Sequence, residues 1–455
     1  MNYVDFMILL ASNPFTYSAA LVGMLAIYLL LFRKQIYSYF DPLFFAIVFT
    51  AFAATDVVFL WWLDQIDSQY LFQFIGTEAT FFIGITLFCP ASSRRNILSG
   101  AAATAKWRPV ILHEGERYFL IVLYVLSAVV FVLTQGITYA LRGIPILYAS
   151  RLEYYSEGGG LGILDRVISV TWFFSCYLLM YCVATRVRIP RALHLFVASA
   201  LVGSALLSGA KSTFIAILFA IFYFRFLRRG DPMYSAFDAS LARLQKGTLI
   251  LAVAAAATVI CVQAASNNPL VVIQVLYVRF ASFGDIYFMA YPKHVVDMIP
   301  GKDAFLALFG NLLAPFRIIG YDDMPESLGY QIHRIIFGFD DFTGPNARHN
   351  VFGLVYFGRV GSMFFSLALG MIVGFIRYSL SAFVRPGSAV EPLYVFLAIS
   401  SVWATTDFTL VTKDIVSAIT VVPVLYAVAA LVCVASTAQA ALNRRGQLLL
   451  APTPE

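Results

Sequence analysis

Charged residues are scarce in this chain of 455 residues, at 12% of the sequence against 60% hydrophobic residues. A soluble globular protein carries about 25% charged residues. The longest stretches without a clear apolar run are about 91–117 and 267–347. The shortage of charge therefore excludes a soluble domain of useful size. Most apolar runs have the length of a membrane-crossing helix, about 20 residues, and predict an integral membrane protein.

The sequence also lacks the common markers of metal and nucleotide sites. Its five cysteines lie in apolar segments or at their ends and show no metal-ligand spacing. This pattern favours packing roles and disfavours a metal site or a disulfide framework. The sequence contains no Walker loop, dinucleotide fingerprint, zinc motif or nucleophile elbow. The net charge of +6 is modest and does not suggest nucleic-acid binding.

The distribution of Lys and Arg predicts the topology. Residues 1–16 carry Asp5 and lack a basic start, so no cleavable signal peptide is expected. The first apolar run ends at Arg33 and Lys34, and such clusters favour the cytoplasmic side. We therefore expect the amino terminus outside and the carboxyl terminus inside. Eleven spans are predicted, at about 17–32, 43–63, 71–89, 118–137, 165–185, 192–208, 212–228, 247–266, 351–376, 391–411 and 415–437.

These spans predict a single all-α polytopic membrane domain over residues 1–455, because lipid forces backbone groups to pair within each span. Two outer loops, about 138–165 and 267–347, are expected to form the active site. In the larger loop, residues 270–291 predict an interfacial helix with polar residues on one broad face and aromatic and aliphatic residues on the other. The alternative is a twelfth span with a polar stripe. The polar residues are Gln274, Arg279, Ser282 and Asp285.

Several arginines lie on the predicted outer side, which the insertion rule disfavours. The shorter outer loop holds Arg142 and Arg151, in front of a glycine run. Binding a polyanion would explain arginines in this position, since a guanidinium can donate two parallel hydrogen bonds to phosphate oxygens. The large outer loop and its edge hold Arg279, Arg317, Arg334 and Arg348.

Two short motifs fit the same chemistry. In RLEYYSEGGGLG, Arg151 is followed by ten residues and then Gly162, and glycines allow backbone amides to approach a bulky anion. The alternative is an exposed loop in which Arg151 pairs with a nearby glutamate. In LLSGAKSTF, Lys211 lies in a short outer turn. A lysine there either meets an anion or extends toward the membrane interface.

A third motif, GPNARHNVFGLVYFGRVG, leads into the ninth predicted span. Arg348 and His349 are expected at its mouth, and Arg359 about two turns deeper. Arg359 either contacts a ligand or pairs with an intramembrane carboxylate, Asp407 or Asp56. The glycines of this segment are interpreted as packing positions that let helices approach closely. They are Gly353, Gly358, Gly361, Gly370 and Gly374.

Taken together, the chain resembles the Wzy-type O-antigen polymerases, which join oligosaccharide repeat units in bacterial envelopes. The resemblance covers most of the length and depends on the order and side of its features. These are about eleven spans, the Arg151-x10-Gly162 loop, LLSGAKSTF, the aromatic segment around Arg279, and SLGYQI followed by HNVFGLVYFGRVG. A second Arg-x10-Gly loop, often described in this family, has its nearest candidate in Arg334 to Gly344, one residue short.

The resemblance implies a glycosyltransferase of the bacterial inner membrane with a periplasmic active site. A glycan on undecaprenyl diphosphate is the donor, and a second lipid-linked repeat is the acceptor. The implied catalytic residues are Arg151, Lys211, Arg279 and His349, with His349 or an outer carboxylate as base. Arg317, Arg334, Arg348, Gly162, Tyr154 and Tyr155 are implied to bind substrate. Because the carrier lipid activates the sugar, no metal or cofactor is implied. A protein that sets chain length is a further expected partner.

Two alternatives remain open from the sequence. His349-Asn350 before a glycine-rich helix resembles the histidine-bearing outer loop of O-antigen ligases, a sister class in which this histidine is the base. A flippase or transporter of the same lipid-linked glycan also needs outer cations. It is further expected to show broken helices or intramembrane carboxylates in matching halves, and no matching halves are evident.

Overall fold

The computed structural model describes residues 1–89, 114–147, 162–208, 211–229, 234–264, 269–300, 303–320, 322–338 and 344–449. Within these ranges every regular element is a helix, which confirms the all-α prediction. Seven helical segments of the described chain are long and apolar enough to cross a membrane. The helices at these segments are α2 (Pro14–Phe32), α3 (Pro42–Trp62), α4 (Ser68–Leu87), α5 (Glu114–Arg142), α7 (Gly162–Ala184), α15 (His349–Gly374) and α18 (Phe408–Leu449).

The other four predicted spans fall on α8 (Arg191–Leu207), α9 (Lys211–Leu227), α10 (Ser235–Ala264) and α17 (Glu391–Val402). The tenth predicted span, 391–411, is interrupted. After Val402 a 3₁₀ turn, η8 (Trp403–Thr405), leads to α18. Asp407 stabilises the start of α18, since its Oδ1 accepts the amide hydrogen of Thr409 at 2.8 Å. The count of eleven spans therefore stays a prediction.

Helix starts follow the expected capping chemistry. Asp41 precedes α3, and its Oδ1 accepts the Leu43 amide at 2.9 Å, while Pro42 occupies the first helical position. Asn2 caps α1 (Tyr3–Ser12) in the same way, accepting the Asp5 amide at 2.8 Å. Pro14 then starts α2. These helices therefore begin at sites that the sequence marks.

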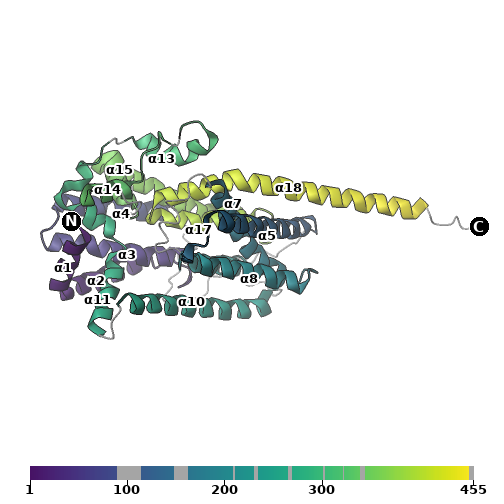
Figure 1. Ribbon diagram of the computed structural model, residues 1–455, viewed down its shortest axis with the longest axis horizontal. Helices are drawn as coiled ribbons and strands as arrows, with labels where there is room; N and C mark the ends of the chain where they lie inside the picture. Colours follow the sequence, from purple (N-terminus) through teal and green to yellow (C-terminus); the bar gives the residue numbers. More distant parts are fainter. Residues whose placement is uncertain are drawn as a thin grey trace, which may run out of the picture.

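The helices bury two apolar cores. One core joins α1, α3, α4, α12 (Asp285–Ala290) and α15. The other joins α5, α7, α8, α9, α17 and α18. Tyr37 and Trp403 pack against both cores. Figure 1 shows the resulting bundle, with the amino terminus at one end and α18 extending from the other.

The predicted large outer loop folds into short helices near the amino-terminal end of the bundle (Figure 1). The expected interfacial helix over 270–291 is two helices, α11 and α12, separated at Ser282–Gly284. A Cβ on Gly284 would lie 2.8 Å from the Ala53 carbonyl oxygen, so α3 leaves no room for a side chain there. All of α12 after Asp285 is buried, so this part is covered by protein. The short helices are α11 (Pro269–Ala281), α12, η5 (Pro292–Asp297), α13 (Ala304–Leu313), η6 (Ala314–Phe316) and α14 (Leu328–Phe337).

Helix α15 is a hairpin of two antiparallel arms that meet at Gly358. This glycine has φ 70° and ψ −175°, a conformation that side chains of L-residues rarely adopt. The His349 Nδ1 and the Ser366 Oγ lie 2.9 Å apart, although the residues are 17 positions apart. A continuous α-helix would separate them by roughly 25 Å. Gly353 in the first arm allows the close approach, since a Cβ there would lie 2.8 Å from that of Ser362.

The hairpin reverses the expected depths of the two arginines in this segment. Arg359, predicted to lie two turns deeper than Arg348, follows the turn and is exposed, with a hydrogen bond to Gln69 at the start of α4. Arg348 and His349, predicted at the mouth, are 2% and 0% exposed. The reason is that the first arm starts inside the bundle and runs outward. Sequence distance along one helix therefore gave the wrong order.

The second arm of α15 packs closely on α4 through glycines. A Cβ on Gly374 would lie 2.8 Å from the Ile85 carbonyl oxygen, and one on Gly370 would clash with the Phe81 carbonyl oxygen. A Cβ on Gly84 of α4 would lie 2.7 Å from the Met371 amide. Small residues at such an interface allow backbones to approach. The packing interpretation of these α15 glycines holds, while Gly358 instead makes the turn.

We expect Gly358→Ala to lower the free energy of unfolding by about 1–3 kcal/mol, because alanine is strained at this backbone conformation. Nothing lies within 4 Å of a Cβ built at Gly358, so conformation alone is tested. Gly136→Ala in α5 is the matched control, since that helical glycine also has an open Cβ position. Unfolding in one detergent measures both. Equal stability of the two variants would contradict the hairpin.

Candidate functional site

A cavity of about 410 Å³ is lined in part by α13, one of the short helices near the amino-terminal end of the bundle. It lies where segments far apart in sequence meet: the first turns of α7, α13, residues 324–328, the first arm of α15 and the first turns of α18. This volume is typical of sites for small molecules and sugars. We refer to it as the amino-end pocket.

Two cations of the amino-end pocket have unused donors. Arg166 on α7 and Lys413 on α18 line it, and within the described part of the chain neither side chain makes a hydrogen bond or an ion pair. The Asn311 side chain of α13 adds a neutral polar group. A cationic group beside apolar helices is costly unless it meets water or an anion. The pocket therefore presents two charges that an anionic ligand can neutralise.

The acidic residues of the pocket are already paired. Asp165 Oδ2 accepts from Arg142 Nη1 at 3.1 Å, and Glu326 Oε2 lies 2.7 Å from Arg334 Nη2. Each pair contributes no net charge, so Arg166 and Lys413 give the lining a positive balance. The Glu326 carboxylate is half-exposed and lines the pocket, so it is available to a solvated ligand.

The first arm of α15 supplies an aromatic wall through Phe352 and Tyr356. Their rings lie with centroids 4.6 Å apart, and Phe352 also stacks on Phe365 of the second arm at 5.4 Å. The arm is therefore fixed against its partner while it faces the pocket. Aromatic rings in such a position suit the apolar faces of sugars.

The start of that arm is anchored by buried polar contacts. His349 shares its Nδ1 hydrogen bond with Ser366, its Nε2 lies 3.3 Å from Glu78 Oε1, and its ring stacks on Phe81 with centroids 5.1 Å apart. The side chain has 1% of its surface exposed, whereas Glu78 retains 12%. In this conformation the histidine presents no atom to a substrate in the pocket. It instead holds the arm in place.

Asn350 and Gln73 extend this anchor. The Gln73 Nε2 donates to the Asn350 carbonyl oxygen and to the Ser362 Oγ, both at 3.0 Å, so one amide ties both arms to α4. The Asn350 side chain accepts from Tyr287 Oη at 2.6 Å and donates to Glu78 Oε1 at 3.0 Å. Buried polar groups with partners specify one arrangement of helices.

Arg348 is bound to backbone carbonyl oxygens. Its guanidinium donates to Phe283 O at 3.0 Å, Phe49 O at 3.3 Å and Thr405 O at 3.4 Å. These carbonyl groups come from three separate segments, so Arg348 joins them. Burial raises the pKa of Asp285 to about 7, and the positive charge of Arg348 opposes that rise.

Four other predicted site residues lie on other elements of the described chain. Arg279 is half-buried in the last turn of α11, where its charge opposes the rise that burial produces in the Tyr3 pKa. Arg317 is exposed after η6, and Arg334 lies beside the amino-end pocket through Glu326. Gly162 lines that pocket. The predicted residues Arg151, Tyr154 and Tyr155 lie outside the described residues, as does the side chain of Lys211.

The sequence analysis missed Arg166 and Lys413 because both fall within or beside predicted spans. A signal was available, since an ionisable residue in a membrane helix marks a functional position by default. What the sequence did not show is that these two helices start side by side at one pocket.

Comparison with models of protein families gives no match, and searches of curated proteins and of solved structures give none either. The functional argument for this chain therefore comes from its own residues and their geometry.

We expect Gln73→Leu to lower the free energy of unfolding by about 1–3 kcal/mol for each buried group that loses its partner. Those groups include the Asn350 carbonyl oxygen and the Tyr291 hydroxyl, which donates to Gln73 at 3.2 Å. Gln69→Leu on the same helix is the control, because its hydrogen bonds reach exposed residues. Unfolding in detergent provides the measurement. A Gln73 variant as stable as the Gln69 variant would refute the anchoring role.

Proposed function

We propose that this membrane protein is a glycosyltransferase that polymerises oligosaccharide repeat units carried on undecaprenyl diphosphate. The reaction is assigned to the periplasmic side of a bacterial inner membrane, with the amino-end pocket as its site. The observation that carries the proposal is a pocket with an aromatic wall and two cations, Arg166 and Lys413, whose side chains make no hydrogen bond or ion pair among the described residues. Gly162, which closes the Arg151 loop of the resemblance, lines the same pocket.

In the proposed reaction, a hydroxyl oxygen of the acceptor glycan attacks the anomeric carbon of the donor glycan. The bond between that carbon and the diphosphate oxygen breaks, and undecaprenyl diphosphate leaves with the bonding electron pair. Glu326 takes the proton of the hydroxyl. Arg166 and Lys413 stabilise the leaving diphosphate, because negative charge grows on its oxygens as the bond breaks. Phe352 and Tyr356 bind the sugar rings.

Other residues of the sequence-based hypothesis keep roles in this proposal. Arg151 begins a loop that ends at the lining residue Gly162, so it is a candidate third phosphate ligand, with Lys211 as a fourth. The described Arg279 does not line this pocket. His349 and Arg348 act as positioning residues, since both are buried and hold the first arm of α15. This assignment favours a polymerase over a ligase, because a ligase needs His349 to reach the acceptor hydroxyl.

One observation favours a second candidate function, transport of a lipid-linked glycan. Helix α15 is broken, and its first arm begins in the bundle beside Glu78 and Arg348, as broken helices do at the binding sites of transporters. The polymerase proposal ranks first because the cations and the aromatic wall lie in the open pocket and not at this buried start.

We expect Arg166→Ala and Lys413→Ala each to reduce polymer formation by about 10²–10³-fold, since each removes a charge that stabilises the leaving group. Arg191→Ala is the control, because Arg191 is exposed at the start of α8 and does not line the pocket. The measurement uses purified protein and a single lipid-linked repeat unit, with products separated by gel and mass spectrometry. Unchanged polymer ladders from both variants would reject the pocket assignment.

The same substrate in sealed proteoliposomes separates polymerase from transporter. The polymerase is expected to yield longer glycans on the carrier lipid and no increase in the rate at which the repeat unit crosses the bilayer. Movement of the intact repeat unit across the bilayer without elongation would instead establish the transporter.

A further inference from the structure

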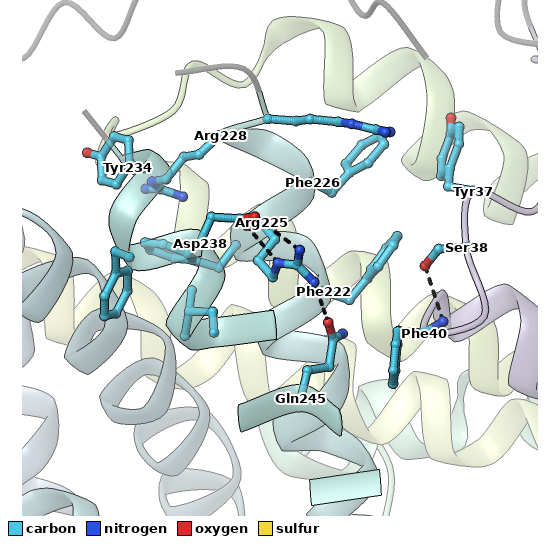
Figure 2. A pocket seen from close by; sticks show the side chains of 14 residues that line it. Tyr37, Ser38, Phe40, Phe222, Arg225, Phe226, Arg228, Tyr234, Asp238 and Gln245 are labelled. Atoms are coloured by element: carbon cyan, nitrogen blue, oxygen red, sulfur yellow. Dashed lines mark hydrogen bonds and ion pairs between the residues drawn. The ribbon is translucent and has the colours of Figure 1, made fainter. Parts of the chain in front are cut away.

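A second cavity, of about 560 Å³, lies near the opposite end of the bundle. Three segments form it: residues 37–40 between α2 and α3, the last turns of α9, and the first turns of α10 (Figure 2). Seven of its lining residues are aromatic, and three are arginines. We refer to it as the carboxyl-end pocket, since it lies at the end from which α18 extends.

The pocket's described acidic residue is neutralised by one of its arginines. Arg225 donates to both oxygens of Asp238, at 2.7 and 3.1 Å, and to Gln245 Oε1 at 2.8 Å (Figure 2). Gln245 is 1% exposed, and its Nε2 has no hydrogen-bond partner within the described ranges. This buried amide is enclosed by protein atoms, and it orients Arg225 through its oxygen.

A second arginine is committed elsewhere, and the third is free. Arg228 forms an ion pair with Glu391 at 2.5 Å and stacks over Phe224 at 3.9 Å. Arg229 is exposed, and among the described residues it makes no hydrogen bond or ion pair. The pocket therefore offers the Arg229 guanidinium as a cationic donor, while the Asp238 carboxylate already accepts from Arg225.

The walls beside this donor are apolar. Tyr37 and Phe226 stack with centroids 4.6 Å apart, and Phe222 stacks on Phe226 at 5.7 Å. On α10, directly beyond the pocket, Leu244 and Ile250 are 54% and 69% exposed. A ligand that contacts both the Arg229 guanidinium and these apolar side chains needs an anionic head group and an apolar tail.

Loops rich in Lys and Arg mark this end of the bundle, which the sequence assigns to the cytoplasmic leaflet. That leaflet contains anionic phospholipids, which basic residues attract. We propose that the carboxyl-end pocket binds the phosphate of an anionic phospholipid, with Arg229 as the cationic donor and the acyl chains along α10. The pocket lies away from the amino-end pocket, so this proposal stands independently of the transfer reaction.

The test measures retained lipid by native mass spectrometry of the full chain, purified in mild detergent with added phosphatidylglycerol. A parallel sample receives phosphatidylcholine with the same acyl chains. We expect preferential retention of phosphatidylglycerol, and about a tenfold weaker apparent affinity in Arg229→Gln, which loses a charge-assisted contact. Arg243→Gln is the matched control, because Arg243 is an exposed arginine of α10 that does not line the pocket.

Equal retention of phosphatidylglycerol by Arg229→Gln and the wild type would overturn the proposal, as would an equal loss in Arg243→Gln. Competition identifies the source of the phosphate. Inorganic phosphate at millimolar concentration is expected to leave the lipid bound. If it displaces the lipid, the site belongs to a free phosphate, and the lipid assignment is wrong.

Discussion

The fold around the amino-end pocket depends on the buried polar contacts that hold the first arm of α15 inside the bundle. A single amide, that of Gln73, donates to both arms of the hairpin, and His349 links the start of one arm to Ser366 on the other. In a low-dielectric interior such contacts are strong when complete and costly when one partner is missing. They place Phe352 and Tyr356 at the pocket, because both residues lie on the arm that these contacts fix.

The arginines of this protein fall into two groups, which differ in burial and in their contacts. Some are buried and paired: Arg348 binds three backbone carbonyl groups, Arg377 pairs with Asp41, and Arg228 pairs with Glu391. A buried guanidinium is costly unless its charge is paired or hydrogen-bonded, so these residues join helices that are distant in sequence. Arg166 and Arg229 are different, because each lines a pocket and makes no hydrogen bond or ion pair among the described residues. The capacity to bind an anion lies with the second group.

The two pockets share a physical design. In each, an arginine neutralises an acidic residue, while another cation remains available beside aromatic walls. In both proposals the aromatic walls bind the apolar part of a ligand, and the remaining charge selects its phosphate. The amino-end pocket is proposed to hold the transfer reaction at one leaflet, and the carboxyl-end pocket is proposed to bind a lipid of the other leaflet.

The sequence by itself determined the membrane class, the helical architecture and most helix starts. Apolar length and local capping, as at Asp41 and Pro42, are short-range properties that need no tertiary contact. It also marked Gly162, which lines a pocket, and the polar residues at the start of α15. The sequence did not predict that His349 and Arg348 are buried, since a glycine at position 358 allows a continuous helix as well as a hairpin. Only the tertiary structure decided which cations stay free. A charge is neutralised by groups that folding brings together, as Phe49 and Thr405 reach Arg348 across 299 and 57 positions of the chain.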